Sequence, residues 1–117
     1  MILTEQIKSL QTRRDELARC LRIEELRIDL TNEEEKTQEP DFWEQPDRAR
    51  EQLRKVASIK RWVEEFDRIA TQVGDLELMP DFVREGVMSE TEMDTAYQTA
   101  LTAIEELELR NIVVATE

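Results

Sequence analysis

The sequence predicts an all-α protein, built as an antiparallel bundle of three long helices. Composition is the first reason: only 2 glycines and 3 prolines occur in 117 residues, so few turns are available and the helices must be long. Apolar periodicity is the second reason, because hydrophobic residues recur at intervals of three and four along most of the chain. A β-sandwich or a βαβ fold needs more glycine, more turns and more β-branched runs.

The first helix is expected from about Thr4 to about Gln38. Its early apolar residues fit a heptad seam in which Arg14 fills the missing place: Leu3, Ile7, Leu10, Leu17 and Leu21. The next apolar residues keep helical spacing but lie two residues out of step with that seam: Ile23, Leu26 and Leu30. This change of phase predicts a helix kinked or broken near Leu21–Ile23, or a rotation of its buried face.

Residues 39–46 form the strongest interruption of the helical pattern. Pro40 discourages helical geometry in the residue before it, and Asp41 begins a single capped turn. Pro46 fits the first position of the next helix, where a missing N–H costs little. The adjacent aromatic residues Phe42 and Trp43 lie in this turn. We expect these five residues to form a structural hinge and a hydrophobic plug at one end of the bundle; the alternative is an exposed aromatic docking patch.

The second helix begins near Pro46 and has the cleanest seam in the chain. The seam residues are Ala49, Leu53, Val56, Ile59, Val63, Phe66, Ala70 and Val73. Trp62 and Ile69 widen this stripe, which predicts that the helix packs on two neighbours and is the central member. Pro80 kinks or ends it, and Gly86 is the expected stop of the connection that follows.

The third helix is predicted from a capping box, Ser89 with Glu92, to about Arg110. Its stripe contains Met93, Ala96, Ala100, Ala103 and Leu107, flanked by Tyr97, Leu101 and Ile104. Beyond it, the β-branched run at 112–114 breaks the period and is expected to be extended. We therefore divide the chain into a helical domain, residues 1–111, and residues 112–117, a tail or the start of a linker to an absent domain.

Composition excludes most catalytic chemistry. The chain has no histidine, one cysteine and two isolated glycines, so it lacks a Ser-His-Asp triad, a thiolate zinc cluster and a phosphate-binding loop. We expect no catalytic, cofactor-binding or metal-binding residues, and no enzymatic activity. Cys20 is expected to be an inert core or boundary residue.

Acidic residues are abundant, and several lie side by side: Glu24/Glu25, Glu33–Glu35, Glu64/Glu65 and Glu105/Glu106. A di-metal bundle site requires Glu-x-x-His motifs, and histidine is absent. Solvated helix faces with i,i+4 ion pairs are the simpler interpretation. Glu51 with Lys55, and Glu64 with Arg68, have the spacing for such pairs.

The formal net charge is −12, from 16 basic and 28 acidic residues. This charge disfavours binding to nucleic acid and favours basic protein surfaces as partners. The N-terminus has no secretory signal pattern, and no apolar run approaches the ~20 residues of a membrane helix. We therefore expect a soluble, cytoplasmic protein.

The stretch from Pro40 to Ala49, Pro-Asp-Phe-Trp-Glu-Gln-Pro-Asp-Arg-Ala, resembles the Pro-Asp-(Phe/Val)-Trp-x-x-Pro-x-x-Ala stretch of bacterial peptide chain release factor 2, in its N-terminal domain. The similarity extends upstream over Leu10–Leu30 and downstream over Lys55–Leu78. Residues 105–111 are similar to the end of the last helix before the codon-reading domain of that family.

The resemblance implies a helical, non-catalytic module of translation termination. In that family the domain is directed toward the stalk base of the large ribosomal subunit and toward the release-factor GTPase. Ser-Pro-Phe and Gly-Gly-Gln elements are absent here, because the prolines follow Glu39, Gln45 and Met79 and the two glycines are not adjacent. The resemblance therefore implies a fragment or truncated product that contacts neither the stop codon nor tRNA; its binding residues cannot be transferred.

The alternative function is a stand-alone helical interaction protein, such as a coiled-coil adaptor or an acidic regulator. Heptad stripes on every predicted helix are compatible with a dimer. In this hypothesis the first seam, from Leu3 to Leu21, is the dimer interface.

Overall fold

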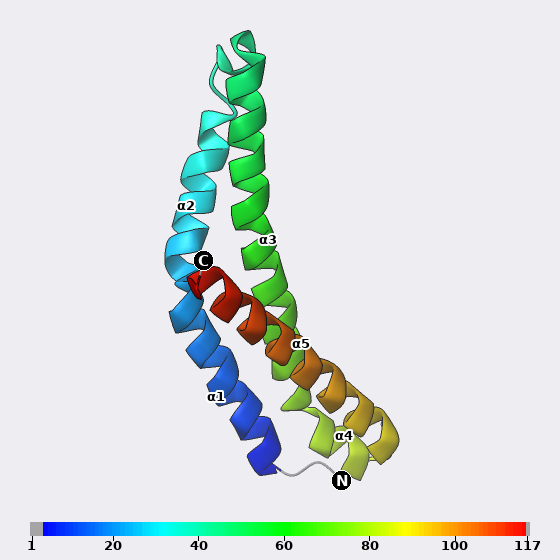
Figure 1. Ribbon diagram of the computed structural model, residues 1–117. Helices are drawn as coiled ribbons and strands as arrows, with labels where there is room; N and C mark the ends of the chain where they lie inside the picture. The colour runs from blue at the N-terminus through cyan, green and yellow to red at the C-terminus, as the bar shows by residue number, and fades with distance from the viewer. Residues whose placement is uncertain (1–3, 117) are drawn as a thin grey trace.

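The computed structural model describes residues 4–116, and all regular structure in this range is helical. The elements are α1 (Thr4–Leu21), α2 (Ile23–Lys36), the 3-10 turn η1 (Phe42–Glu44), α3 (Pro46–Leu76), α4 (Met79–Arg84) and α5 (Glu90–Thr116), shown in Figure 1. The predicted all-α class is confirmed.

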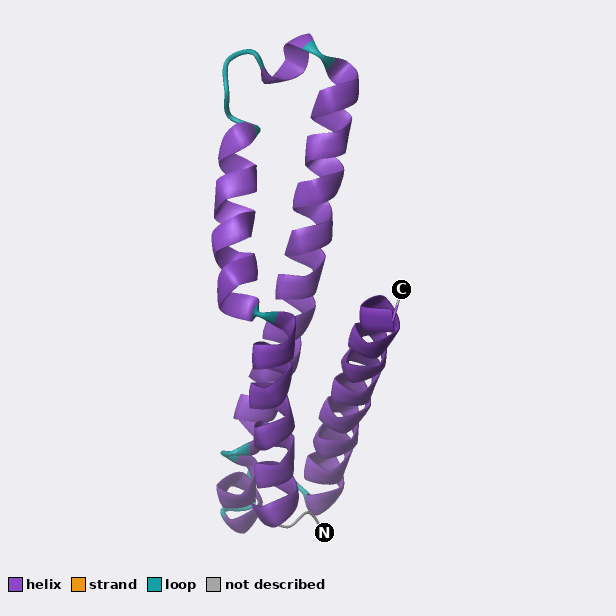
Figure 2. Ribbon diagram, turned by 60° about the vertical axis from the view of Figure 1, so that its left-hand side comes forward, coloured by secondary structure: helices purple, strands orange, loops and turns teal. Residues whose placement is uncertain are grey.

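The molecule is elongated, 60 × 33 × 19 Å, and its two ends are built differently. Helices α1 and α2 follow one another along the antiparallel α3, whereas α5 lies against α1 and α3 in the lower half only (Figures 1 and 2). We call residues 23–61 the arm and the remaining described residues the base. The three-helix packing predicted for the whole chain is thus limited to the base, and the arm is a two-helix hairpin.

A single residue separates α1 from α2. Arg22 has a left-handed backbone, φ 55° and ψ 51°, and its N–H donates to the carbonyl oxygen of Arg19 at 3.1 Å. The next helix begins at once, and Ile23 is buried with the α1 residues Leu10 and Leu17. The break predicted near Leu21–Ile23 is therefore confirmed, and its rotation accounts for the change of phase. Leu3, assigned to the first seam, lies outside the described residues.

The core lies in the base, where α1, α3 and α5 meet. Its fully buried members include Leu10, Leu76, Ile104, Leu107 and Val73. Helix α3 contacts α1, α2 and α5, as predicted for the central helix. In α5 the buried face is rotated slightly from the predicted stripe, so that Tyr97 and Ile104 are buried while Ala96 and Ala103 lie at its edge.

The end of α5 corrects a prediction. Residues 112–116 continue the helix rather than forming an extended segment. Strand propensity depends strongly on pairing and burial, and this segment has no neighbouring strand within the described residues. Adding a residue to an existing long helix gains a backbone hydrogen bond without a new nucleation cost.

The connection from α3 to α5 uses two terminal motifs that the sequence predicted. After α4, Gly86 has φ +75° and its N–H donates to Val83 O at 3.1 Å, while the Val87 N–H donates to Phe82 O at 2.9 Å. This pair of bonds is a Schellman motif. At the start of α5, the backbone N–H of Glu92 donates to Ser89 Oγ at 3.1 Å, which satisfies one free helix donor.

The two glycines are expected to respond to alanine with opposite signs. Gly86→Ala places a Cβ in the left-handed region and should lower the free energy of unfolding by about 1–2 kcal/mol. Gly74 lies inside α3, and a Cβ added there would have no atom within 4 Å. Gly74→Ala should therefore raise the free energy of unfolding by about 0.5–1 kcal/mol. Urea unfolding of both variants measures the difference; a stabilised Gly86→Ala would contradict the prediction.

Candidate docking surface

The tip of the arm presents the aromatic pair of residues 42 and 43. Phe42 and Trp43 are the first two residues of η1, and their ring centroids lie 4.8 Å apart with ring planes at 80°. Pro46 is the first residue of α3, as predicted. Asp41 stands at the N-cap of η1, but its side chain makes no capping hydrogen bond there.

The hydrophobic plug predicted for residues 40–46 is not formed by Trp43, which is 68% exposed. Phe42 is half-buried and lines a shallow hollow of about 240 Å³ together with Lys36, Arg48 and Gln52. Successive side chains of a 3-10 turn point about 120° apart, so two adjacent rings cannot both face inward. A two-helix hairpin also lacks the third helix that would cover the outer ring. The alternative prediction, an exposed aromatic, matches the exposure of Trp43.

Glu33 lies at the centre of a polar cluster that joins the two helices of the arm. Gln52 Nε2 donates to Glu33 Oε2 at 2.7 Å and to the Glu33 carbonyl oxygen at 2.9 Å. The ammonium groups of Lys55 and Lys36 lie 3.1 and 3.2 Å from the carboxylate. The hydrogen bond from Gln52, followed by those from Lys55 and Lys36, lowers the pKa of Glu33 to about 2. The cluster was not predicted.

Lowering the pH is expected to reduce the stability of the folded protein, because protonation of Glu33 removes its ionic contacts. Because its pKa is lower in the folded protein than in the unfolded chain, the stabilisation is complete above pH ~5 and is lost as the pH falls toward 2. The melting temperature of Glu33→Gln should therefore depend less on pH in this interval than that of the parent chain. Glu34→Gln, at an exposed neighbouring position, is the control. Equal acid sensitivity of Glu33→Gln and the parent chain would contradict the assignment.

Two further ion pairs connect elements far apart in the sequence. Arg27 binds Asp67 with both terminal nitrogens, at 3.0 and 2.6 Å, and this lowers the pKa of the Asp67 carboxyl group. In the base, Arg13 also binds Glu108 in a bidentate manner, through Nε at 3.1 Å and one terminal nitrogen at 2.5 Å. The first pair joins α2 to α3 and the second joins α1 to α5. Two parallel hydrogen bonds define the relative orientation of the two side chains, which a single ammonium contact does not.

A third polar contact joins α3 to the end of α5. Arg110 donates to Glu65, and its guanidinium carbon lies 5.1 Å from the centre of the Trp62 ring. Trp62 is half-buried in this position, consistent with its predicted role in widening the α3 stripe. The stack is a cation–π contact that orients both side chains.

The predicted i,i+4 ion pairs are present, as Lys60–Glu64 and Arg61–Glu65, but the two pairs named from the sequence do not form. Lys55 pairs with Glu33 of α2 rather than with Glu51, and Glu64 pairs with Lys60 rather than with Arg68. Within residues 4–116 no group of three or more potential ligands is arranged to hold a metal ion. No helix in this range has the length and apolar character needed to cross a membrane.

Cys20 is exposed, which corrects the prediction of a core or boundary residue. The break at Arg22 follows two residues later, and the buried face of α1 there is carried by Leu17. Cys20 is therefore a surface thiol.

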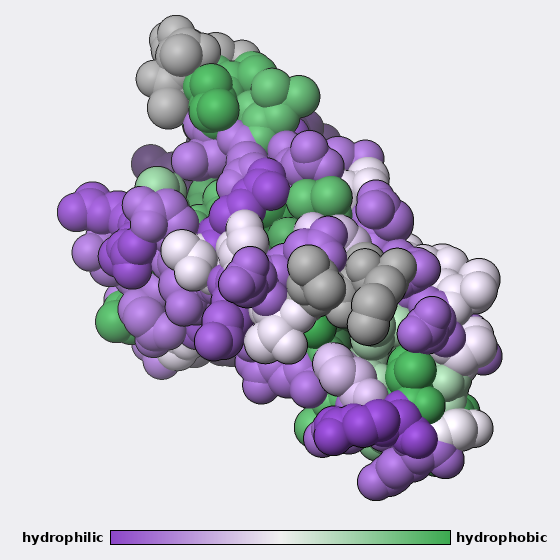
Figure 3. Space-filling view, turned by 90° about the horizontal axis from the view of Figure 1, so that it is seen from below, coloured by the Kyte–Doolittle hydropathy of each residue, from purple (hydrophilic) through white to green (hydrophobic). Residues whose placement is uncertain are grey.

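Exposed apolar side chains also gather at two places in the base, seen as green surface at opposite corners of Figure 3. One group surrounds α4 and contains Leu78, Phe82 and Val87. The other follows the end of α5 and contains Leu109, Ile112, Val113 and Val114. Neither patch was predicted: Phe82 and Val87 lie near the connection expected after Pro80, Leu109 lies in the predicted third helix, and residues 112–114 were expected to be extended.

Comparisons of the chain with protein-family models, with curated proteins and with solved structures gave no match. The resemblance to a release-factor domain therefore depends on the residues quoted for it, chiefly the stretch from Pro40 to Ala49.

Proposed function

We propose that this chain is a non-catalytic docking module of translation termination, similar to the N-terminal domain of peptide chain release factor 2. It acts in the cytoplasm, binds toward the stalk base of the large ribosomal subunit and communicates with the release-factor GTPase. It reads no stop codon and hydrolyses no peptidyl-tRNA. The stand-alone acidic interaction protein is the competing proposal.

The observation that carries this proposal is the exposure of Trp43 at the tip of the arm. Tryptophan is enriched at the energetic centres of protein interfaces, and this ring is 68% exposed. The connection around it, residues 37–45, contains three acidic residues and no basic one. An apolar anchor surrounded by carboxylates suits a basic protein surface that has an apolar pocket. The same residues belong to the stretch that resembles the release factor.

Binding of the purified chain to the isolated stalk-base protein and to large ribosomal subunits tests the proposal. We expect weak binding that falls as salt rises, because surface charges are screened over ~10 Å at 0.1 M ionic strength. Trp43→Ala should weaken binding at least tenfold without changing the melting temperature. Phe82→Ala, at the other end of the molecule and 37% exposed, is the matched control and should bind normally.

Three outcomes would reject the proposal: no binding to either target, equal binding by Trp43→Ala, or stop-codon-dependent peptide release by the chain alone. The coiled-coil form of the alternative gains no support from α1. Three of its proposed seam residues, Ile7, Leu10 and Leu17, are buried against α3 and α5 within one chain. A dimer through these residues would have to open the core of the base.

A further inference from the structure

Although the net charge of the chain is −12, the part of α3 that lies in the arm is basic. Residues 46–61 carry six basic and two acidic residues, a net charge of +4. The neighbouring helix α2 has the opposite balance, with six acidic and two basic residues. The prediction that the chain avoids nucleic acid used the average charge, but charges act locally because salt screens them over ~8–10 Å.

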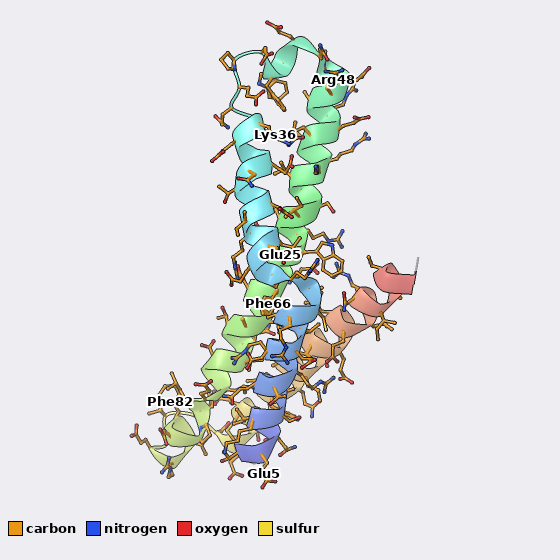
Figure 4. The ribbon with its side chains drawn as sticks, turned by 90° about the vertical axis from the view of Figure 1, so that its left-hand side faces the viewer. Glu5, Glu25, Lys36, Arg48, Phe66 and Phe82 are labelled. Carbon is orange, nitrogen blue, oxygen red and sulfur yellow. The ribbon has the colours of Figure 1, made fainter. Side chains whose placement is uncertain are left out.

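Three arginines of this segment form a line along α3. At 100° per residue, Arg50, Arg54 and Arg61 lie within about 40° of one another, on the side of α3 opposite Val56 and Val63. All three are exposed, with side-chain exposures of 66% for Arg50 and 72% for Arg61. Figure 4 shows side chains of upper α3 standing away from α2, with Arg48 labelled at the top. We call Arg50, Arg54 and Arg61 the arginine line.

The arginine line is only lightly engaged within the chain. Arg54 makes no ion pair within the described residues. Arg50 pairs with Asp47, whose side chain is 95% exposed, and Arg61 approaches Glu65 at 3.4 Å. The Arg50–Asp47 pair is exposed on both sides and therefore weak, so a stronger anionic partner can replace it. Glu65 also accepts from Arg110, so its carboxylate does not depend on Arg61.

We propose that the arginine line binds the phosphate backbone of RNA. Guanidinium groups bind phosphate oxygens in a bidentate manner, and a row of them on one helix face can follow a phosphodiester strand. Between Arg54 and Arg61 this face carries the small side chains of Ala57 and Ser58, and at Ser58 and Arg61 it borders the apolar end of α5 with Val113 and Val114. The choice of RNA over DNA rests on the proposed function at the ribosome; the binding surface is separate from Trp43.

A protein partner fits the arginine line less well. Stable protein interfaces have an apolar core, often with aromatic anchors. Here the exposed apolar side chains of α5 lie at the Arg61 end of the arginine line, and the residues between the arginines, Ala57 and Ser58, are small. The same reasoning weakens pairing with a second copy through its acidic α2, since such a contact would bury little apolar area. Contacts to phosphate need no apolar core, because released counterions supply most of the binding free energy.

The test is binding of the full chain to a fluorescently labelled RNA hairpin, measured by anisotropy at several salt concentrations. Three phosphate contacts predict that log K falls with log salt at a slope of about −3. Arg50→Glu/Arg54→Glu should reduce the affinity at least tenfold. Lys8→Glu/Arg19→Glu on α1 changes the net charge by the same amount at exposed positions and should leave RNA binding within about twofold. Circular dichroism establishes that both variants are folded.

Absence of RNA binding at 50 mM salt would overturn the proposal. Equal losses in the two double variants would also overturn it, because net charge and not the arginine line would then control binding. A salt-sensitive dimer that is lost only in Arg50→Glu/Arg54→Glu would assign the face to a second copy instead. Trp43→Ala should bind RNA like the parent chain. Failure of the RNA test therefore leaves the stalk-base assay unaffected, and the reverse also holds.

Discussion

Phe66→Ala is expected to lower the free energy of unfolding by about 3–5 kcal/mol, the typical cost of deleting a buried aromatic side chain. Phe66 is 6% exposed and packs in the core that α1, α3 and α5 share. Its removal deletes the largest buried side chain of α3 and leaves a cavity among the three helices that share the core. Urea unfolding followed by circular dichroism measures the change.

Trp43→Ala is the internal comparison for that experiment. Although tryptophan is larger than phenylalanine, its ring is exposed at the tip of the arm, so we expect a change within about 0.5 kcal/mol. If Trp43→Ala were as destabilising as Phe66→Ala, the tip would be closed by a buried ring, as the sequence analysis expected.

Leu10→Ala is expected to cost about 2–5 kcal/mol, because Leu10 is 1% exposed and its loss leaves a cavity between α1 and its neighbours. This variant also separates the two functional hypotheses. If Leu10 belongs to an intramolecular core, the melting temperatures of the parent chain and the variant do not depend on protein concentration. If the first seam forms a dimer, both should rise with concentration. Thermal melts over a hundredfold range of concentration, with light scattering, distinguish these results.

The helices could be predicted from the sequence because their apolar spacing and terminal residues agree. Pro46, Ser89 and Gly86 each mark a boundary by a local mechanism that needs no knowledge of the tertiary structure. The break at Arg22 was also predictable, since apolar residues on either side of it are out of phase. Local rules of this kind depend only on the backbone and on adjacent side chains.

The arrangement of the helices could not be predicted in the same way. Spacing shows that a face is apolar, but not how far along a helix its neighbour extends. The sequence therefore predicted three packed helices along the whole molecule, whereas the third helix packs only in the base. For the same reason Trp43 was predicted to be a buried plug, although it is exposed. Lys55 likewise had a suitable partner four residues away, yet the structure offers Glu33 on the opposite helix. One signal for the Glu33 cluster was present, because Glu33 continues the helical spacing of Leu26 and Leu30.

The uneven burial along the molecule has a dynamic consequence. Among residues 23–61, only Ile23 and Ala49 are fully buried apolar residues. Leu26, Leu30, Val56 and Ile59 are partly buried, and polar contacts such as those of Glu33 also join the two helices. Amide protons there should exchange with solvent through local opening, well before those around Ile104, whose exchange requires global unfolding. The end that carries Trp43 can thus change its shape by local opening while the opposite end keeps its conformation.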